Sequence, residues 1–253
     1  MAQRNATGWE RLFVEFERTE TRRSYLVCSL PRSGSSLLCE LLAATGVAGA
    51  PTEFFHPDKM AALRERWGVA TLDGYVRELL ARKTSPNGVF GAKAHWGQYR
   101  PAFGDADPRI LFPDVRLVFI TRRDRLRQAI SWVRALQTRK WADQDRPPVD
   151  RPAVFDYEDI TAKLMRIDRE EETWEALFER HAIVPQRVVY EDFVESRDET
   201  VRAVLDALGI DAPSDLHLPP PELARQADEL SEEWVERYLA ESATSPAPAR
   251  GDA

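Results

Sequence analysis

The sequence predicts an α/β protein in which a mostly parallel sheet is covered by helices on both faces, giving three layers. Two observations support this prediction: short apolar runs of strand length recur along the chain, and segments with helical spacing alternate with them. Strands that alternate with helices usually pair in parallel, and their connections place helices on both faces of the sheet. The chain has 253 residues, 43% of them hydrophobic, which is enough for one substantial core.

Four segments are predicted strands because each is a short apolar run bounded by turn or loop residues. They are residues 25–30, 89–93, 115–121 and 187–190. The first strand runs directly into a small-residue loop and then a helix, which is the order of a phosphate-binding unit. The third also runs into a helix, after Arg122 and Arg123.

Apolar residues at three- and four-residue intervals predict the helices. They cover residues 9–18, 37–44, 71–82, a segment ending near 139, 157–181, 199–208 and 224–239. Glu170, Glu171 and Glu172 are expected on the solvent face of the long helix at 157–181.

The order of these elements predicts three parts of the chain. They are a lead-in segment at 1–23, one domain over 24–241, and a disordered tail at 242–253.

Composition limits the classes of partner and compartment. A net charge of −7 argues against nucleic acid as the main partner. Cys28 and Cys39 are too few for a disulfide framework or a four-cysteine metal site, so we expect two packed, reduced thiols. No segment has the roughly 20 apolar residues of a membrane span, and the first residues lack the apolar run of a secretory signal. These features predict a cytoplasmic protein.

The loop at 29–36 keeps part of the phosphate-loop pattern G-x-x-x-x-G-K-[ST]. Gly34 falls on the second glycine and Ser36 on the hydroxyl residue, but Ser29 and Ser35 replace the first glycine and the lysine. The lost lysine argues against ATP or GTP as donor. The backbone N–H groups at the start of the helix, together with Arg32, instead suit a single 5′-phosphate that carries a sulfuryl group. The alternative is an ordinary loop with a serine cap.

A second anion site is expected where the strand at 115–121 ends. Arg122 or Arg123 emerges there, and Ser131 follows on the next helix. Two anion sites at the carboxyl ends of parallel strands suit a nucleotide with phosphates at both its 5′ and 3′ positions. Ser131 has the alternative of bonding back to its own helix.

The run Leu30-Pro31-Arg32-Ser33-Gly34-Ser35-Ser36 resembles the 5′-phosphosulfate loop of sulfotransferases that use 3′-phosphoadenosine 5′-phosphosulfate (PAPS). Four further stretches resemble the trehalose 2-sulfotransferases of mycobacteria. They are 44–49 with Glu53-Phe54-Phe55, 132–141, 223–228 and 233–238. The resemblance implies a fold akin to nucleoside kinases, PAPS as co-substrate, no metal, a sugar acceptor and a homodimer.

The resemblance also implies roles for individual residues. The residues implied in binding PAPS are Arg32, Ser33, Gly34, Ser35, Ser36, Arg122 or Arg123, Ser131, Tyr190, Arg225 and Gln226. Glu53 maps onto the general base, which would take the proton of the acceptor hydroxyl, while Arg32 would offset charge on the sulfuryl group. Without the resemblance, Glu53 reads as a surface carboxylate.

Acceptor contacts are assigned more broadly. The candidates are Glu53, His56, the pair Lys93 and His95 at the end of the strand at 89–93, and Trp132, Arg134, Gln137 and Trp141. Lys93 could instead be a surface lysine, His95 a packed histidine, and the tryptophans core residues. The family pattern has an acidic residue where this chain has Ala50, so the acceptor could be another sugar, a glycolipid headgroup or a glycosylated product.

Two other functions fit the same residues. One is a small-molecule kinase with a degenerate phosphate loop, and the other is a noncatalytic protein that binds a nucleotide or sugar. The sequence leaves open the acceptor, the choice between Arg122 and Arg123, and whether the segment 56–70 is ordered.

Overall fold

The computed structural model describes residues 13–141, 151–218 and 229–244. These residues form two compact units. The first unit comprises the described residues up to Arg123 together with 170–218, and it contains the sheet. The second comprises the described residues of 124–169 and 229–244.

The sheet of the first unit has four parallel strands in the order β2-β1-β3-β4. Their bounds are β1 Arg23–Ser29, β2 Val89–His95, β3 Val115–Thr121 and β4 Gln186–Val189. In the central strand β1, Cys28 stands in register with Ala94 on one side and Phe119 on the other. All four predicted strands are confirmed, and their carboxyl ends share one edge of the sheet.

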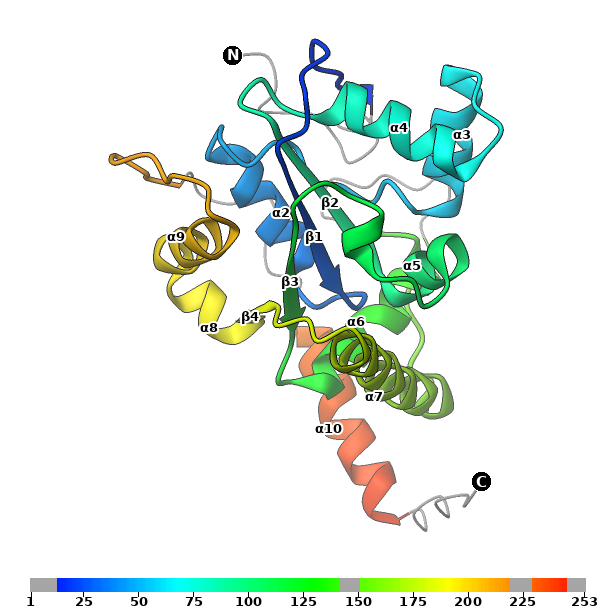
Figure 1. The fold of residues 1–253 in the computed structure, drawn as a ribbon. Coiled ribbons are helices and arrows are strands. Elements are labelled where there is room, and N and C mark those ends of the chain that lie inside the picture. The colour runs from blue at the N-terminus through cyan, green and yellow to red at the C-terminus, as the bar shows by residue number, and fades with distance from the viewer. Residues whose placement is uncertain (1–12, 142–150, 219–228, 245–253) are drawn as a thin grey trace. The chain divides into compact units, whose positions relative to one another are not determined.

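Helices cover the sheet of the first unit, as predicted, and α2 and α9 lie on one side of it with α5 on the other (Figure 1). The helices of this unit are α2 Ser35–Ala44, α3 Pro57–Trp67, α4 Leu72–Lys83, α5 Trp96–Phe103, α8 Tyr190–Glu195 and α9 Arg197–Leu208, with a 3₁₀ turn, η1, at Pro108–Ile110. The last turns of α7 (Tyr157–Arg180) also belong here, and Trp174 packs edge-on against Trp96.

The second unit consists of α6 (Arg125–Thr138), the first turns of α7 and α10 (Glu229–Thr244). Arg127 of α6 pairs with Glu232 of α10 at 2.5 Å, and the ring of Trp234 packs edge-on against Phe155. The helices predicted to end near 139 and to run to 239 are therefore present, the described part of the latter beginning at Glu229.

Three helices were not predicted, each for a physical reason. Helix α3 buries only Leu63, so its sequence lacks an apolar stripe. Helix α5 contains Gly97 and Pro101, two residues of poor helix propensity. Helix α8 is only six residues long and follows directly on β4.

Two other predictions were wrong. Residues 14–18, the described end of the helix expected at 9–18, are not helical. Glu170 is buried, with 6% of its surface exposed, rather than solvated. It lies three residues after Ile167 and four before Trp174, and this spacing places it on the apolar face of α7.

Cys28 and Cys39 are buried free thiols, in agreement with the prediction. Within the described ranges, no helix has both the length and the apolarity needed to cross a membrane.

Candidate active site at the carboxyl ends of the strands

The loop between β1 and α2 leads directly into a helix start, where backbone N–H groups can bind an anion. Gly34 adopts a left-handed conformation, with φ of 87°, and a Cβ atom there would lie 2.3 Å from Cδ2 of Tyr190. Gly34 makes no side-chain cap, so the first N–H groups of α2 stay available. Among the described residues, the buried Ser33 hydroxyl has no hydrogen-bond partner. A bound phosphate would satisfy both sets of donors.

Arg32 lies at the turn of this loop in a left-handed conformation, with φ of 63°. Such a backbone costs a non-glycine residue about 1–3 kcal/mol, and strain of this kind gathers at ligand sites. The side chain of Arg32 is half-buried, Ser35 is buried and Ser36 is exposed.

Glu53 sits on a loop that is clamped to the sheet. The backbone N–H of Lys93 donates to the carbonyl of Thr52 at 2.9 Å. Phe54 and Phe55 are each 1% exposed, and the Tyr75 hydroxyl donates to the carbonyl of Phe54 at 2.7 Å. Burying each phenylalanine contributes about 1.5–3 kcal/mol, so the loop has little freedom to move.

Lys93 joins the carboxylate of Glu53 to the phosphate loop. Its Nζ lies 2.7 Å from Glu53 Oε1 and donates to Ser36 Oγ at 2.9 Å. The Lys93 side chain is only 4% exposed, whereas that of Glu53 is 20% exposed. One ammonium group therefore bridges the candidate base and the candidate donor site.

His95 is hydrogen-bonded on both sides of the turn between β2 and α5. Its side chain accepts from the backbone N–H of Gln98, and its Nδ1 lies 3.0 Å from Ser29 Oγ. Nε2 lies 3.9 Å from Glu53 Oε1, so this edge of the ring faces the carboxylate.

The charges around Glu53 set its protonation state. Burial raises the pKa of the Glu53 carboxyl, but Lys93, His95 and Lys59 together outweigh burial and hold the pKa well below 4.5. Burial lowers the pKa of His95 to about 4, against the attraction of Glu53. At neutral pH the site thus contains an ionised Glu53 and a neutral His95.

Arg122, which follows β3, packs against Tyr190, which follows β4. The Arg122 guanidinium lies 4.9 Å from the centre of the Tyr190 ring, whose edge covers Gly34, and its Nε is 3.8 Å from Glu191. Arg123 is 57% exposed and makes two hydrogen bonds to Asp192, at 2.8 and 2.6 Å. Of the two arginines, Arg122 is the one beside the loop.

Several predicted residues belong to the second unit. In the second unit, Trp132 is buried, with Arg166 4.9 Å from its ring centre, and Arg134 donates to Ser231. The amide of Gln137 makes both its hydrogen bonds to the backbone of Val154. This unit also holds the half-buried Ser131 and the exposed Trp141, while Arg225 and Gln226 fall outside the described residues.

In the first unit, His56 precedes α3, and its backbone N–H donates to the carbonyl of Glu53 at 3.1 Å. Sequence reasoning missed two residues that lie near Glu53. One is Lys59, on the unpredicted helix α3, whose own pKa is lowered first by burial. The other is Gln98, which donates to Glu53 Oε2 at 2.8 Å. The three-residue spacing from His95 to Gln98, typical of a helix start, is the signal that could have revealed it.

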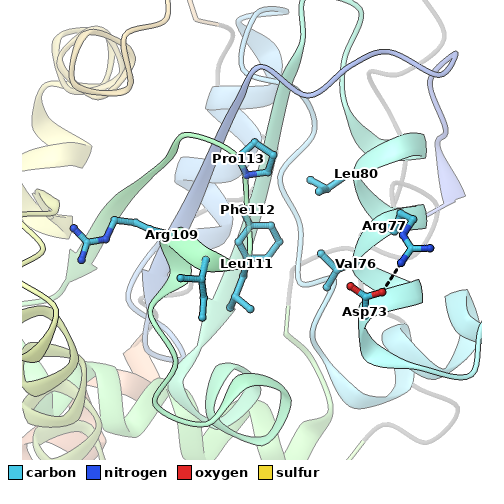
Figure 2. A pocket seen from close by; sticks show the side chains of 9 residues that line it. Asp73, Val76, Arg77, Leu80, Arg109, Leu111, Phe112 and Pro113 are labelled. Atoms are coloured by element: carbon cyan, nitrogen blue, oxygen red, sulfur yellow. Dashed lines mark hydrogen bonds and ion pairs between the residues drawn. The ribbon is translucent and has the colours of Figure 1, made fainter.

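A separate groove of about 410 Å³ lies in the first unit between α4 and the segment around η1 (Figure 2). Its lining combines apolar and charged side chains and comprises Asp73, Val76, Arg77, Leu80, Arg109, Ile110, Leu111, Phe112 and Pro113. None of these is a predicted site residue. The groove residues 109–113 precede β3, whereas Arg122 follows it.

The described residues contain no group of three or more His, Cys, Asp or Glu side chains that could hold a metal ion.

Comparison with known proteins identifies the family. Residues 24–241 match the family model of the Stf0 sulphotransferases. The chain is 35% identical over 253 residues to the trehalose 2-sulfotransferase of Mycolicibacterium smegmatis, covering 85% of this chain and 94% of that protein. It is 32% identical over 258 residues to the trehalose 2-sulfotransferase of Mycobacterium tuberculosis, covering 87% and 96%.

Among solved structures, the sulfotransferase domain of the Synechococcus PCC 7002 olefin synthase aligns with a TM-score of 0.47 at 14% identity, covering 91% of this chain and 98% of that one. The family match spans most of the chain, and both mycobacterial relatives are more than 30% identical to it over most of their length. This chain therefore belongs to the Stf0 sulphotransferase family.

Proposed function

We propose that this protein transfers the sulfuryl group of PAPS to a hydroxyl of a carbohydrate, with trehalose or a related sugar as the first acceptor to test. The observation that carries the proposal is the position of Lys93, between Glu53 Oε1 at 2.7 Å and Ser36 Oγ at 2.9 Å. It connects a carboxylate that can take a proton with a loop that can bind a phosphosulfate.

The phosphate loop suits the 5′-phosphosulfate of the donor. The N–H groups at the start of α2 and the buried Ser33 hydroxyl are its hydrogen-bond donors, and Arg32 supplies a guanidinium. Arg122 is the better candidate for the 3′-phosphate, because it lies against the Tyr190 ring that covers Gly34, whereas Arg123 is exposed at the surface.

In the proposed reaction the acceptor oxygen forms a bond to sulfur while the bond from sulfur to the oxygen of the 5′-phosphate breaks. The hydroxyl proton passes to Glu53, and 3′-phosphoadenosine 5′-phosphate (PAP) leaves. A positioned base typically contributes about 100- to 10,000-fold in rate. Glu53 is ionised at neutral pH because its pKa lies well below 4.5.

His95 does not suit the role of base, because burial lowers its pKa to about 4. Its Nε2 lies 3.9 Å from Glu53 Oε1, so the ring can help to position the carboxylate.

Proton transfer and charge build-up can be coupled through Lys93. Before reaction its ammonium charge is offset by the Glu53 carboxylate. When Glu53 becomes protonated, this attraction is lost just as negative charge grows on the leaving group beside Ser36. The ammonium is then available to stabilise the leaving group, and such preorganised charges act strongly in a largely dry site.

The test is to incubate the purified protein with PAPS and a sugar panel that includes trehalose. PAP release and the mass of the sulfated product are then measured. The Glu53→Gln variant should still bind PAPS but transfer about 100- to 10,000-fold more slowly. Glu175→Gln is a matched control, because Glu175 pairs with Arg187 at the surface.

If PAPS does not bind and no acceptor releases PAP, the proposal is wrong. If PAPS binds but the wild-type protein transfers nothing to any sugar, the protein is a noncatalytic binder or uses an acceptor of another class.

A further inference from the structure

We propose that Gln98 is a positioning residue that fixes the orientation of the Glu53 carboxylate; this inference rests on the proposed role of Glu53. Gln98 is 8% exposed and lies in the first turn of α5. Its Nε2 donates to Glu53 Oε2 at 2.8 Å, and its Oε1 accepts from the backbone N–H of His95 at 3.2 Å. Both ends of the amide are therefore in use.

The orientation of this amide follows from its neighbours. A flipped amide would place its oxygen against the Glu53 carboxylate and its NH₂ group against the N–H of His95. Both contacts would be repulsive, so only one orientation satisfies the two groups. Gln98 must present a donor to Glu53.

A carboxylate needs two anchors to be fixed, because rotation about its last bond has only broad minima. Lys93 holds Oε1 and Gln98 holds Oε2, so the two donors engage different oxygens. With Lys93 alone, the carboxylate could rotate about one contact. Gln98 thus determines which lone pair of Glu53 faces the acceptor hydroxyl.

The same hydrogen bond affects acidity. A donor to the ionised form stabilises it and lowers the pKa of the carboxyl group. The loss of Gln98 Nε2 should therefore raise the pKa of Glu53, and a negative charge at position 98 should raise it further. The pKa of Glu53 should therefore rise in the order wild type, Gln98→Met, Gln98→Glu. A residue that only stabilised the fold would not produce this order.

The experiment compares wild-type protein with Gln98→Met, which keeps the length of the side chain but removes both hydrogen bonds, and Gln98→Glu, which adds a like charge. Tyr99→Phe is the matched control, because it removes a hydrogen bond from the same helix, to the carbonyl of Ala106, without contact to Glu53. PAP binding measured by calorimetry and unfolding followed by circular dichroism verify that each variant is folded.

We expect Gln98→Met to lower kcat by about 10- to 100-fold, with PAP affinity unchanged, because a misplaced group can cost about 100-fold. The acid limb of the kcat profile should move to higher pH in the order wild type, Gln98→Met, Gln98→Glu. Tyr99→Phe should leave both unchanged. Two results would refute the inference. One is an acid limb at the same pH in wild type, Gln98→Met and Gln98→Glu, and the other is a kcat for Gln98→Met equal to that of Tyr99→Phe.

The carboxyl carbon of Glu53 can also be titrated by NMR, without acceptor or donor. An upward shift of its pKa in Gln98→Met supports the positioning contact even if the wild-type protein transfers no sulfuryl group, a result that would reject the proposed function alone. No shift in that titration rejects the role of Gln98 while leaving the proposed function intact.

Discussion

Replacing Gly34 by alanine tests the contact that shapes the phosphate loop. The backbone at Gly34 has φ of 87°, which strains any residue with a Cβ. The new Cβ would lie 2.3 Å from Cδ2 and 2.9 Å from Cε2 of Tyr190, so the ring must also move. Moving it would disturb the stacking with Arg122, whose guanidinium lies 4.9 Å from the ring centre.

The two costs can be separated with a control. The left-handed backbone costs alanine about 1–2 kcal/mol. Overpacking adds about 1–3 kcal/mol, so Gly34→Ala should lower the free energy of unfolding by about 2–5 kcal/mol. Gly46 has φ of 75°, but its Cβ would meet no atom within 4 Å. Gly46→Ala should therefore show only the backbone cost.

Urea unfolding of both variants measures this difference, and calorimetry with PAP measures the effect on binding. Gly34→Ala should be the less stable of the two and bind PAP more weakly, while Gly46→Ala should bind it normally. Adding Tyr190→Ala to Gly34→Ala should recover the overpacking part of the loss. Equal destabilisation by the two alanine variants would show that Tyr190 does not cover the loop.

Three further predictions follow from the site. Arg122→Gln should weaken PAP binding by about 10- to 100-fold in calorimetry while leaving adenosine 5′-phosphate binding nearly unchanged, since a hydrogen bond to a charged group contributes about 1.5–3 kcal/mol; Arg123→Gln should change neither. Lys93→Met should slow transfer and raise the pKa of Glu53, because Lys93 is the largest influence that lowers it; an unmoved acid limb would contradict this. The pKa of His95 falls from 6.5 unfolded to about 4 folded, so the unfolded chain binds more protons in that window and stability is lost as pH falls through it. His95→Asn should reduce this loss in the free energy of unfolding by at most about 3 kcal/mol. Urea unfolding at several pH values between 6.5 and about 4 measures the effect.

The fold was largely predictable because its signal is local. The run 115–121 is apolar and short, and β3 occupies the same residues. Helices α4 and α9 lie within one or two residues of their predicted bounds, because their apolar spacing is regular. Helix α3 was missed because it has no apolar stripe and is held instead by tertiary contacts, such as the buried Leu63 and the stacking of Trp67 on Tyr75.

The site was predictable only where a residue's role depends on its own element. Glu53 and the loop at 31–36 could be proposed as site residues from the sequence, because the motifs and the helix start carry the signal. The choice between Arg122 and Arg123 could not be made from the sequence. It depends on their neighbours Tyr190 and Asp192, which lie in α8, directly after β4. Gln98 was missed because its significance lies in a contact with a loop 45 residues away.

The missing lysine of the phosphate loop is another case in which a contact from a different element could not be predicted from the sequence. Ser35 stands where the pattern has lysine, and from sequence alone this reads as a lost charge. Strand β2 is parallel to β1 with Lys93 in register with Val27, and the long Lys93 side chain reaches Ser36 from the neighbouring strand. An ammonium group therefore lies beside Ser36 although the loop itself has no lysine. What distinguishes this ammonium from a phosphate-loop lysine is its second partner, Glu53, and in the proposed reaction protonation of Glu53 would leave the ammonium free to act on the leaving group.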